Sequence, residues 1–244
     1  MEHPRGPMAF DLADFSLASM LRCGRGVRRS TQNSGSLQAA ADAIVRYLYT
    51  DSGTTADGKR ACALIRSYRT FSYDRLDMAQ RTYADERLRL PTANPDMKCL
   101  TLIASVGDEA EWCSPETSHG HRVIPLPSPE IVEQAPMIAQ LIRQMGLDID
   151  SVVRPQADII PELEGKTYNV FHVEQALGSP YIPAQDDFVI PYGVRSVVGF
   201  GGLLRSGDLF TVIMFSRVPI GEEAASRFRT VALDVKAAFF RFED

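Results

Sequence analysis

The chain has 244 residues, of which 45% are hydrophobic and 23% are charged, and its formal net charge is −5. These values are ordinary for one large globular domain, and the negative charge gives no reason to expect nucleic acid or an anionic membrane as a partner. The sequence has no apolar run near 18 residues and does not begin with a signal-peptide pattern, so we expect a cytoplasmic protein.

The first half of the chain predicts two helices and two strands. Residues 1–35 form an N-terminal extension in which we expect a docked helix followed by a basic loop. Residues 36–50 have apolar side chains at the spacing of one helical face. Apolar runs at 61–73 and 99–106 predict strands, and the segment 74–96 between them is polar without a predicted element.

The middle of the chain is rich in proline and loops. An extended piece, RVIPLPSP, leads into a helix predicted from Pro129 to Met145, and Gly146 is a natural stop. The stretch 147–165 is irregular, and 167–173 returns to strand.

Residues 189–218 predict a β-hairpin with its turn at Arg205–Asp208. The second strand, Leu209 to Val218, is apolar on both faces, as is typical of the centre of a covered sheet. The first strand carries three glycines, which mark either room for a ligand or close packing. They are Gly199, Gly201 and Gly202.

A final helix is predicted from Glu222 to Phe242, with apolar residues spaced 4, 3, 4, 3, 4. They are Ala224, Phe228, Val231, Val235, Ala238 and Phe242. This spacing fits a helical seam in a homodimer, and it also fits a helix that packs back on its own sheet.

The order of these elements predicts an α+β fold, because strands and helices do not alternate as a parallel sheet requires. We expect a central antiparallel sheet of about five to six strands flanked by helices. The predicted domains are an extension at 1–35 and a main domain at 36–244.

The hairpin PYGVRSVVGFGGLLRSGDLFTVIMFSRV and the amphipathic helix after it resemble the last two core strands and exit helix of a GAF domain. The runs CGRGVRRS, ACALIRSYRT and FHVEQALGSPYIPAQDDFVIPYG resemble, more narrowly, GAF-like sensory modules of bacterial histidine kinases (two-component systems), cyclases and phosphatases. The resemblance implies a dimeric, non-catalytic sensor that binds a small molecule between its sheet and the covering loops. Terminal helices would then pass the signal to an output domain.

The aromatic and polar residues around the loop at 174–195 suggest a small-molecule pocket under that loop. The candidate ligand-binding residues are His121, Tyr168, His172, Tyr181, Tyr192, Arg195 and Phe200. Arg195 either binds a ligand anion or pairs with Asp186 or Asp187.

The cofactor is unknown from sequence, and haem with His172 as its ligand is an alternative to a structural role for that histidine. His119 and His121 lack an evident third ligand, so no metal site is predicted. Four widely spaced cysteines, without a CxxC pair, predict free thiols.

No known catalytic motif is present, so we expect a regulatory domain rather than an enzyme. One enzyme class remains as an alternative, because free methionine-(R)-sulfoxide reductases share the GAF fold and use cysteine thiolates. Cys99 and Cys113 are the candidate pair for that chemistry.

Overall fold

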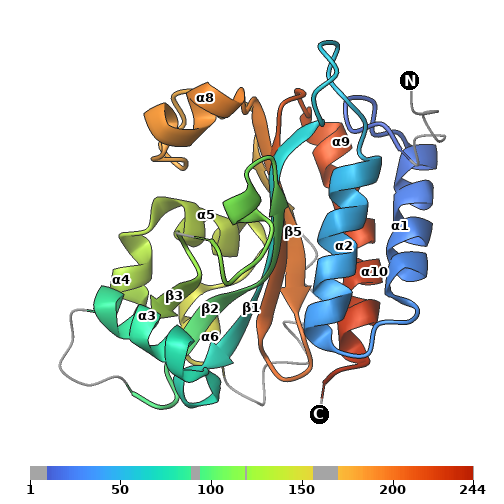
Figure 1. Cartoon of the computed structure of the whole chain (residues 1–244). Coiled ribbons are helices and arrows are strands. Elements are labelled where there is room, and N and C mark those ends of the chain that lie inside the picture. Colours follow the sequence, from blue (N-terminus) through green and yellow to red (C-terminus); the bar gives the residue numbers. More distant parts are fainter. Residues whose placement is uncertain (1–9, 89–93, 119, 156–169, 244) are drawn as a thin grey trace.

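A computed structural model of the chain describes residues 10–88, 94–118, 120–155 and 170–243 (Figure 1). Its centre is a six-stranded sheet in the order β3-β2-β1-β6-β5-β4. All neighbouring strands are antiparallel, which confirms the predicted α+β class. The strands are β1 (Cys62–Ser72), β2 (Lys98–Gly107), β3 (Val123–Leu126), β4 (Val170–Val173), β5 (Ser196–Leu203) and β6 (Leu209–Ser216).

Strands β1 and β6 form the middle of the sheet and are covered on both faces. Along β6, Leu209 and Ile213 face one core, while Phe210 and Val212 face the other. This alternation confirms the prediction that β6 lies at the centre of a covered sheet.

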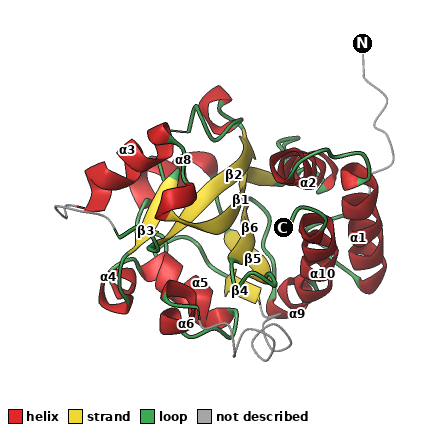
Figure 2. Ribbon diagram, turned by 90° about the horizontal axis from the view of Figure 1, so that it is seen from below, coloured by secondary structure: helices red, strands yellow, loops and turns green. Residues whose placement is uncertain are grey.

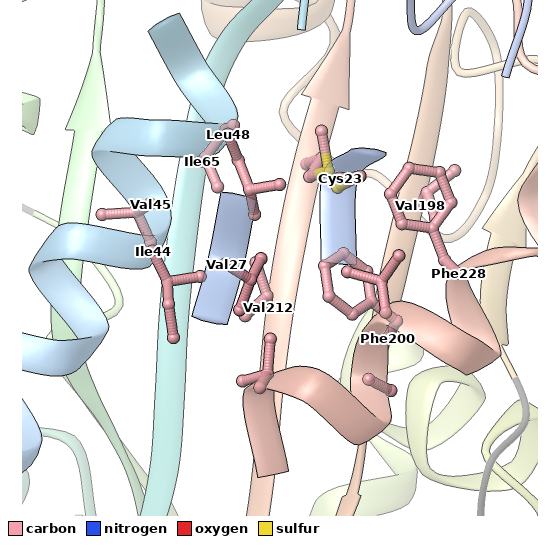
Figure 3. Close-up of a cluster of buried hydrophobic side chains, with 14 of the residues drawn as sticks. Cys23, Val27, Ile44, Val45, Leu48, Ile65, Val198, Phe200, Val212 and Phe228 are labelled. Atoms are coloured by element: carbon pink, nitrogen blue, oxygen red, sulfur yellow. The ribbon is translucent and has the colours of Figure 1, made fainter. Parts of the chain in front are cut away.

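Three long helices cover one face of the sheet (Figures 1 and 2). They are α1 (Leu17–Thr31), α2 (Leu37–Asp51) and α10 (Phe228–Phe240), and α10 is preceded by the short α9 (Glu222–Ser226). Their apolar stripes close over the strands in a packed core (Figure 3). The Phe228 ring stacks on Phe15 with 4.2 Å between centroids, and it lies 5.0 Å from the Phe200 ring. We call this side the helix face.

Helix α1 differs from the expected helix and loop, because it continues through the basic stretch to Thr31. Tyr47 of α2 packs so closely that a Cβ at Gly26 would lie 2.0 Å from its ring. The glycine therefore allows α1 and α2 to pack closely. In the sequence alone, glycine at this place had favoured a loop after a shorter helix. Packing between α1 and α2 is continuous across residue 35, and a domain boundary there stays a prediction.

The predicted final helix is two helices, α9 and α10, and its seam residues are turned inward. Phe228, Val231 and Val235 are fully buried against the chain's own sheet and helices. The spacing that suggested a dimer seam is thus used within one chain, so it no longer supports a dimer. Leu233 and Phe240 are the large apolar residues that α10 leaves exposed.

Shorter elements cover the opposite face, which we call the cavity face (Figure 2). They include α4 (Pro129–Glu133), α5 (Pro136–Gln144), α6 (Ile149–Val153), a π-helical turn at Gln185–Val189 and α8 (Ile190–Tyr192). Helix α3 (Met78–Leu88) packs instead in a separate small core with Cys99 of β2 and Val123 of β3. The predicted helix at 129–145 is divided because Pro136 cannot donate a backbone hydrogen bond. Helix α3 was not predicted: only Ala84 in it is buried, so its sequence carries little amphipathic pattern.

The turn between β5 and β6 lies where the sequence predicted, and a buried ion cluster holds it. Asp208 pairs with Arg69 of β1 at 3.0 Å and with Lys98 of β2 at 2.9 Å. Ser206 donates its hydroxyl to Asp208 at 2.9 Å. The hairpin turn is therefore fastened to β1 and, beyond it, to β2. None of the helices in the described residues is long and apolar enough to cross a membrane.

Candidate functional site

A cavity of about 490 Å³ lies on the cavity face, between the middle of the sheet and three covering segments. Strands β1 and β6 form its floor. The cover comes from the loop between β2 and β3, the junction of α4 and α5, and the segment before α8. The lining residues are Leu64, Arg66, Tyr68, Trp112, Gly120, His121, Ile124, Gln134, Ala135, Pro136, Met137, Ile138, Ile182, Pro183, Ala184, Phe188, Ile213 and Phe215.

Aromatic rings form one wall of the cavity. Phe188 meets Phe215 edge-on with 5.0 Å between ring centroids, and it meets Trp112 in the same way at 5.5 Å. Tyr192 supports this wall from behind, 4.6 Å from the Trp112 ring. Edge-to-face contacts of this kind fix ring orientations, so the wall is held in place without a ligand. Trp112 is also the chain's only tryptophan.

Arg66 is the charged residue on the floor, and its side chain is 8% exposed. Its Nη1 donates to the backbone carbonyl of Gly120 at 3.2 Å and lies 3.5 Å from the Tyr68 hydroxyl. Its Nε is buried and has no acceptor among the described residues. Among the described residues, no ion pair joins Arg66 to a carboxylate, and no aspartate or glutamate lines the cavity. A buried charge without a counter-ion is costly, so this guanidinium is primed to receive an anion.

His121 borders the cavity in a strained backbone conformation, with φ at 60°. Its side chain is exposed at the edge of the cavity, yet nearby protein atoms remove part of the ring's hydration. That desolvation, together with the positive charges of Arg66 and Arg87, lowers the pKa of His121 below its ordinary value of 6.5. The imidazole is therefore neutral at pH 7 and can donate or accept a hydrogen bond.

Of the predicted ligand-binding residues, His121 lines this cavity. Tyr181 and Tyr192 belong to the cover without lining the space, and the Tyr192 hydroxyl donates to Glu109 at 3.0 Å. Phe200 lies on the helix face, in the core with Phe228 (Figure 3). Tyr168 lies outside the described residues.

Arg195 does not reach the cavity. Its side chain is exposed, and its backbone pairs with Ala176 and Ser216. Asp186 and Asp187 are also exposed, and no ion pair between either of them and Arg195 is present among the described contacts. The arginine that the cavity does contain, Arg66, was not singled out from the sequence.

His172 also lies away from the cavity. Its neighbours in β4, Phe171 and Val173, face the cavity side, so His172 points to the helix face. Its Nε2 lies 2.7 Å from the backbone carbonyl of Ile220 and must donate to it. That hydrogen bond holds the chain just before the final helical segment. It is a structural role for His172, which was the alternative to haem ligation in the sequence analysis.

The strand glycines serve packing rather than ligand space. A Cβ at Gly201 would lie 2.0 Å from the carbonyl oxygen of Phe210 in the paired strand. A Cβ at Gly199 would press on Phe171 at 3.2 Å. A bulky residue at position 201 is therefore expected to disturb the hairpin itself.

The cysteine pair proposed for a reductase is separated by the length of a strand. Cys99 lies at the start of β2 and Cys113 beyond its end, and the eight steps from Cys99 to Gly107 span about 26 Å. Burial raises the pKa of the Cys99 thiol to about 12 and that of Cys62 to about 12, which is opposite to the activation a nucleophilic thiolate needs. Within the described ranges, no group of three or more metal-binding side chains is present.

The fold and the site together define an α+β domain with an antiparallel sheet and a cavity of a size for a small molecule. The walls of this cavity are mostly apolar, and its floor carries the positive charge of Arg66. No protein-family model and no curated protein sequence matches the chain. Solved structures similar to it include the GAF domain of an Acinetobacter phosphoenolpyruvate-protein phosphotransferase, at 15% identity and a TM-score of 0.42, with 91% of this chain and 93% of that one covered.

A free methionine-R-sulfoxide reductase from Neisseria meningitidis is similar at 12% identity and a TM-score of 0.46, covering 92% of this chain and 91% of that one. A second GAF domain, from Coxiella burnetii, is similar at 10% identity and a TM-score of 0.44, with 89% and 90% covered. GAF domains are thus among the similar structures, as the sequence resemblance implied, and the functional argument rests on the cavity of this chain.

Proposed function

We propose that this chain is a regulatory domain that senses a small molecule bound in the cavity above Arg66. The observation that carries the proposal is an apolar cavity at the centre of the sheet whose floor holds a buried guanidinium with no counter-ion among the residues that the structure describes. Small-molecule sites have this composition, with mostly apolar walls and a few placed polar groups.

The loop between β2 and β3 links the cavity to the helix face. At one end of this loop, Gly120 accepts a hydrogen bond from Arg66. At the other end, Asp108 pairs with Arg217 and accepts a hydrogen bond from the Tyr49 hydroxyl of α2 at 2.6 Å. A ligand that engages Arg66 would bias this loop, and it can shift the domain only by its difference in affinity for the two arrangements.

The proposed partners of the domain are an output kinase, cyclase or phosphatase domain and a second copy of the chain. Because the predicted seam residues are buried in the chain's own core, we propose that the dimer uses the exposed apolar residues of the terminal helices α1 and α10 instead. These are Leu17, Leu21, Leu233 and Phe240. Light scattering of the Leu233→Glu variant should show a monomer if this surface joins two chains, and an unchanged mass would contradict it.

The sensing proposal is tested by filling the cavity. Ile213 lies on the cavity floor, and the residue before it in β6, Val212, faces the opposite core. Ile213→Phe therefore fills the cavity, and Val212→Ile is the matched control that enlarges a side chain away from it. A library of small-molecule fragments that includes anionic, neutral and cationic compounds would be screened against the wild-type chain by saturation-transfer difference NMR. We expect hits that disappear in Ile213→Phe and persist in Val212→Ile, with both variants folded by circular dichroism. An absence of hits, or hits that survive in Ile213→Phe, would contradict the proposal.

A further inference from the structure

The charge balance of the cavity identifies the chemical class of its occupant. Arg66 is a permanent cation on the floor, and the described residues of the lining include no carboxylate that could neutralise it. The other ionisable residues of the lining, Tyr68 and His121, are neutral at pH 7, because burial raises the pKa of Tyr68 and crowding lowers that of His121. The described lining of the free protein's cavity therefore carries one positive charge, that of Arg66, and no negative charge to balance it.

The surroundings of Arg66 are arranged to hold the guanidinium rather than to neutralise it. The Gly120 carbonyl fixes Nη1, and the side chain leaves β1 on the same face as Leu64 and Tyr68. Arginine donors in a planar fork match the two oxygens of a carboxylate. Resting on the proposed function, we propose that the ligand is a small carboxylic acid whose carboxylate binds Arg66 and whose ring-sized apolar body lies against the aromatic wall.

A single carboxylate fits this charge better than a phosphate ester does. A phosphate monoester carries a charge near −2 at pH 7, and among its described residues the cavity offers one cation, Arg66, to balance it. The second negative charge would be buried among apolar side chains without a partner, which is unfavourable. A cationic ligand would meet Arg66 with the same sign and is excluded by repulsion.

The apolar walls of the cavity constrain the part of the ligand that lies beyond its carboxylate. Trp112, Phe188 and Phe215 present ring edges and faces, and Ile124 and Met137 complete an apolar lining. Phe188, Phe215, Ile124 and Met137 offer no hydrogen-bonding group, so a heavily hydroxylated acid would lose hydrogen bonds on entering. An aromatic acid such as phenylacetate satisfies both ends of the cavity.

The test compares three probes that share a phenyl ring: phenylacetate, phenylacetamide and phenyl phosphate. Trp112 lines the cavity and is the only tryptophan, so its fluorescence reports binding at this site, and calorimetry provides the affinity. We expect phenylacetate to bind at least tenfold more tightly than either of the other probes. A charge-assisted hydrogen bond of about 1.5–3 kcal/mol corresponds to roughly 10- to 150-fold.

Two arginine variants locate the effect. In Arg66→Met the preference for phenylacetate over phenylacetamide should disappear, while Arg195→Met, which removes an exposed arginine outside the cavity, should keep it. Equal binding of phenylacetamide, or an unchanged preference in Arg66→Met, would overturn the carboxylate assignment and leave the cavity a ligand site. If none of the three probes binds the wild-type chain and the fragment screen also yields no hit, the proposed function falls as well.

Discussion

Two arginines of β1, three residues apart, show how the two faces of this sheet differ. Arg69 is 4% exposed and pairs with the Asp208 carboxylate at 3.0 Å. Arg66 is 8% exposed on the opposite face and has no carboxylate partner among the described residues. Both have a buried Nε without an acceptor, so the counter-ion is what distinguishes them. Arg69 is neutralised within the fold, whereas Arg66 has no such partner in the described parts of the chain, and our proposal gives it a ligand anion.

The same contrast runs through the two cores. The helix face is filled by interlocking apolar side chains, whereas the cavity face retains open space, a left-handed non-glycine residue at His121 and an unneutralised charge. Features that cost stability collect at binding sites because function requires them. Each of the following experiments alters one side of this comparison.

The largest effect is expected from emptying the helix face. Phe228→Ala removes a ring stacked between Phe15 and Phe200, and the free energy of unfolding should fall by about 3–5 kcal/mol because the cavity cannot collapse. Urea denaturation measures it. The matched change on the cavity face, Phe188→Ala, should cost less, since that ring is only partly buried. Equal losses would contradict the contrast between the two faces.

Removing the carboxylate from Asp208 should leave the buried Arg69 guanidinium without its counter-ion. Breaking this buried pair leaves Arg69 and Lys98 without their partner, so Asp208→Asn should lower the free energy of unfolding by about 3 kcal/mol. Asp42→Asn, which breaks the exposed pair with Arg46, should change it by less than about 0.5 kcal/mol. A loss at Asp208 no larger than that at Asp42 would mean that the buried pair does not stabilise the hairpin.

The Asp208 cluster also sets a pH dependence. Burial alone raises the pKa of Asp208, but the hydrogen bonds and charges of Lys98 and Arg69 outweigh it and hold the pKa below 3.8. A carboxyl whose pKa is lower in the folded state contributes stability that is present above the unfolded pKa and is lost as the pH falls through the folded pKa. The stability advantage of wild type over Asp208→Asn should therefore shrink below about pH 4. A difference that stays constant down to pH 2 would contradict this.

Removing the unpaired charge should not destabilise the free protein. Arg66→Met keeps much of the side-chain length and replaces a buried guanidinium by an apolar group, so the free energy of unfolding should rise by about 0–2 kcal/mol. Thermal and urea unfolding without ligand measure it. A loss above about 2 kcal/mol would show that Arg66 stabilises the fold, in the manner of Arg69.

The smallest effect is a titration shift next to the cavity. The Arg66 charge is one of the causes that lower the pKa of His121, after desolvation and before Arg87. In Arg66→Met the pKa of His121 should therefore rise toward 6.5 without reaching it, because the desolvation of the ring remains. NMR titration of the His121 ring protons follows it. No change, or a further fall, would place Arg66 too far away to act on the ring.

The sequence predicted the sheet well because its signals are local. Alternation at Leu209–Ser216 fixes which side chains of β6 face each core, and the turn at Arg205–Asp208 sets the pairing of β5 with β6. Helix α3 was missed because its contacts, rather than its own pattern, hold it. The spacing of α10 could not distinguish a dimer seam from packing on its own sheet, since both bury the same stripe.

The site was predicted less well for a physical reason. The sequence indicated a pocket under the loop at 174–195 and included His121 among its residues. An arginine inside a strand usually faces solvent, so Arg66 was passed over. One signal was available: Arg66 shares the inward alternation of Leu64 and Tyr68 in an otherwise apolar strand. The sequence predicted that His172 and Phe200 bind the ligand. Which face of the sheet these side chains occupy depends on the strand register, and the pattern of the loop does not reveal that register.

The central claim is tested most directly by locating a bound acid in a crystal. Crystals of the full chain soaked with 4-bromophenylacetate would be measured at the bromine absorption edge. We predict an anomalous peak inside the cavity, against Trp112 and Phe188, with the carboxylate oxygens within hydrogen-bonding distance of the Arg66 guanidinium. A cavity without bromine signal, or a molecule bound there with its carboxylate turned away from Arg66, would contradict the account.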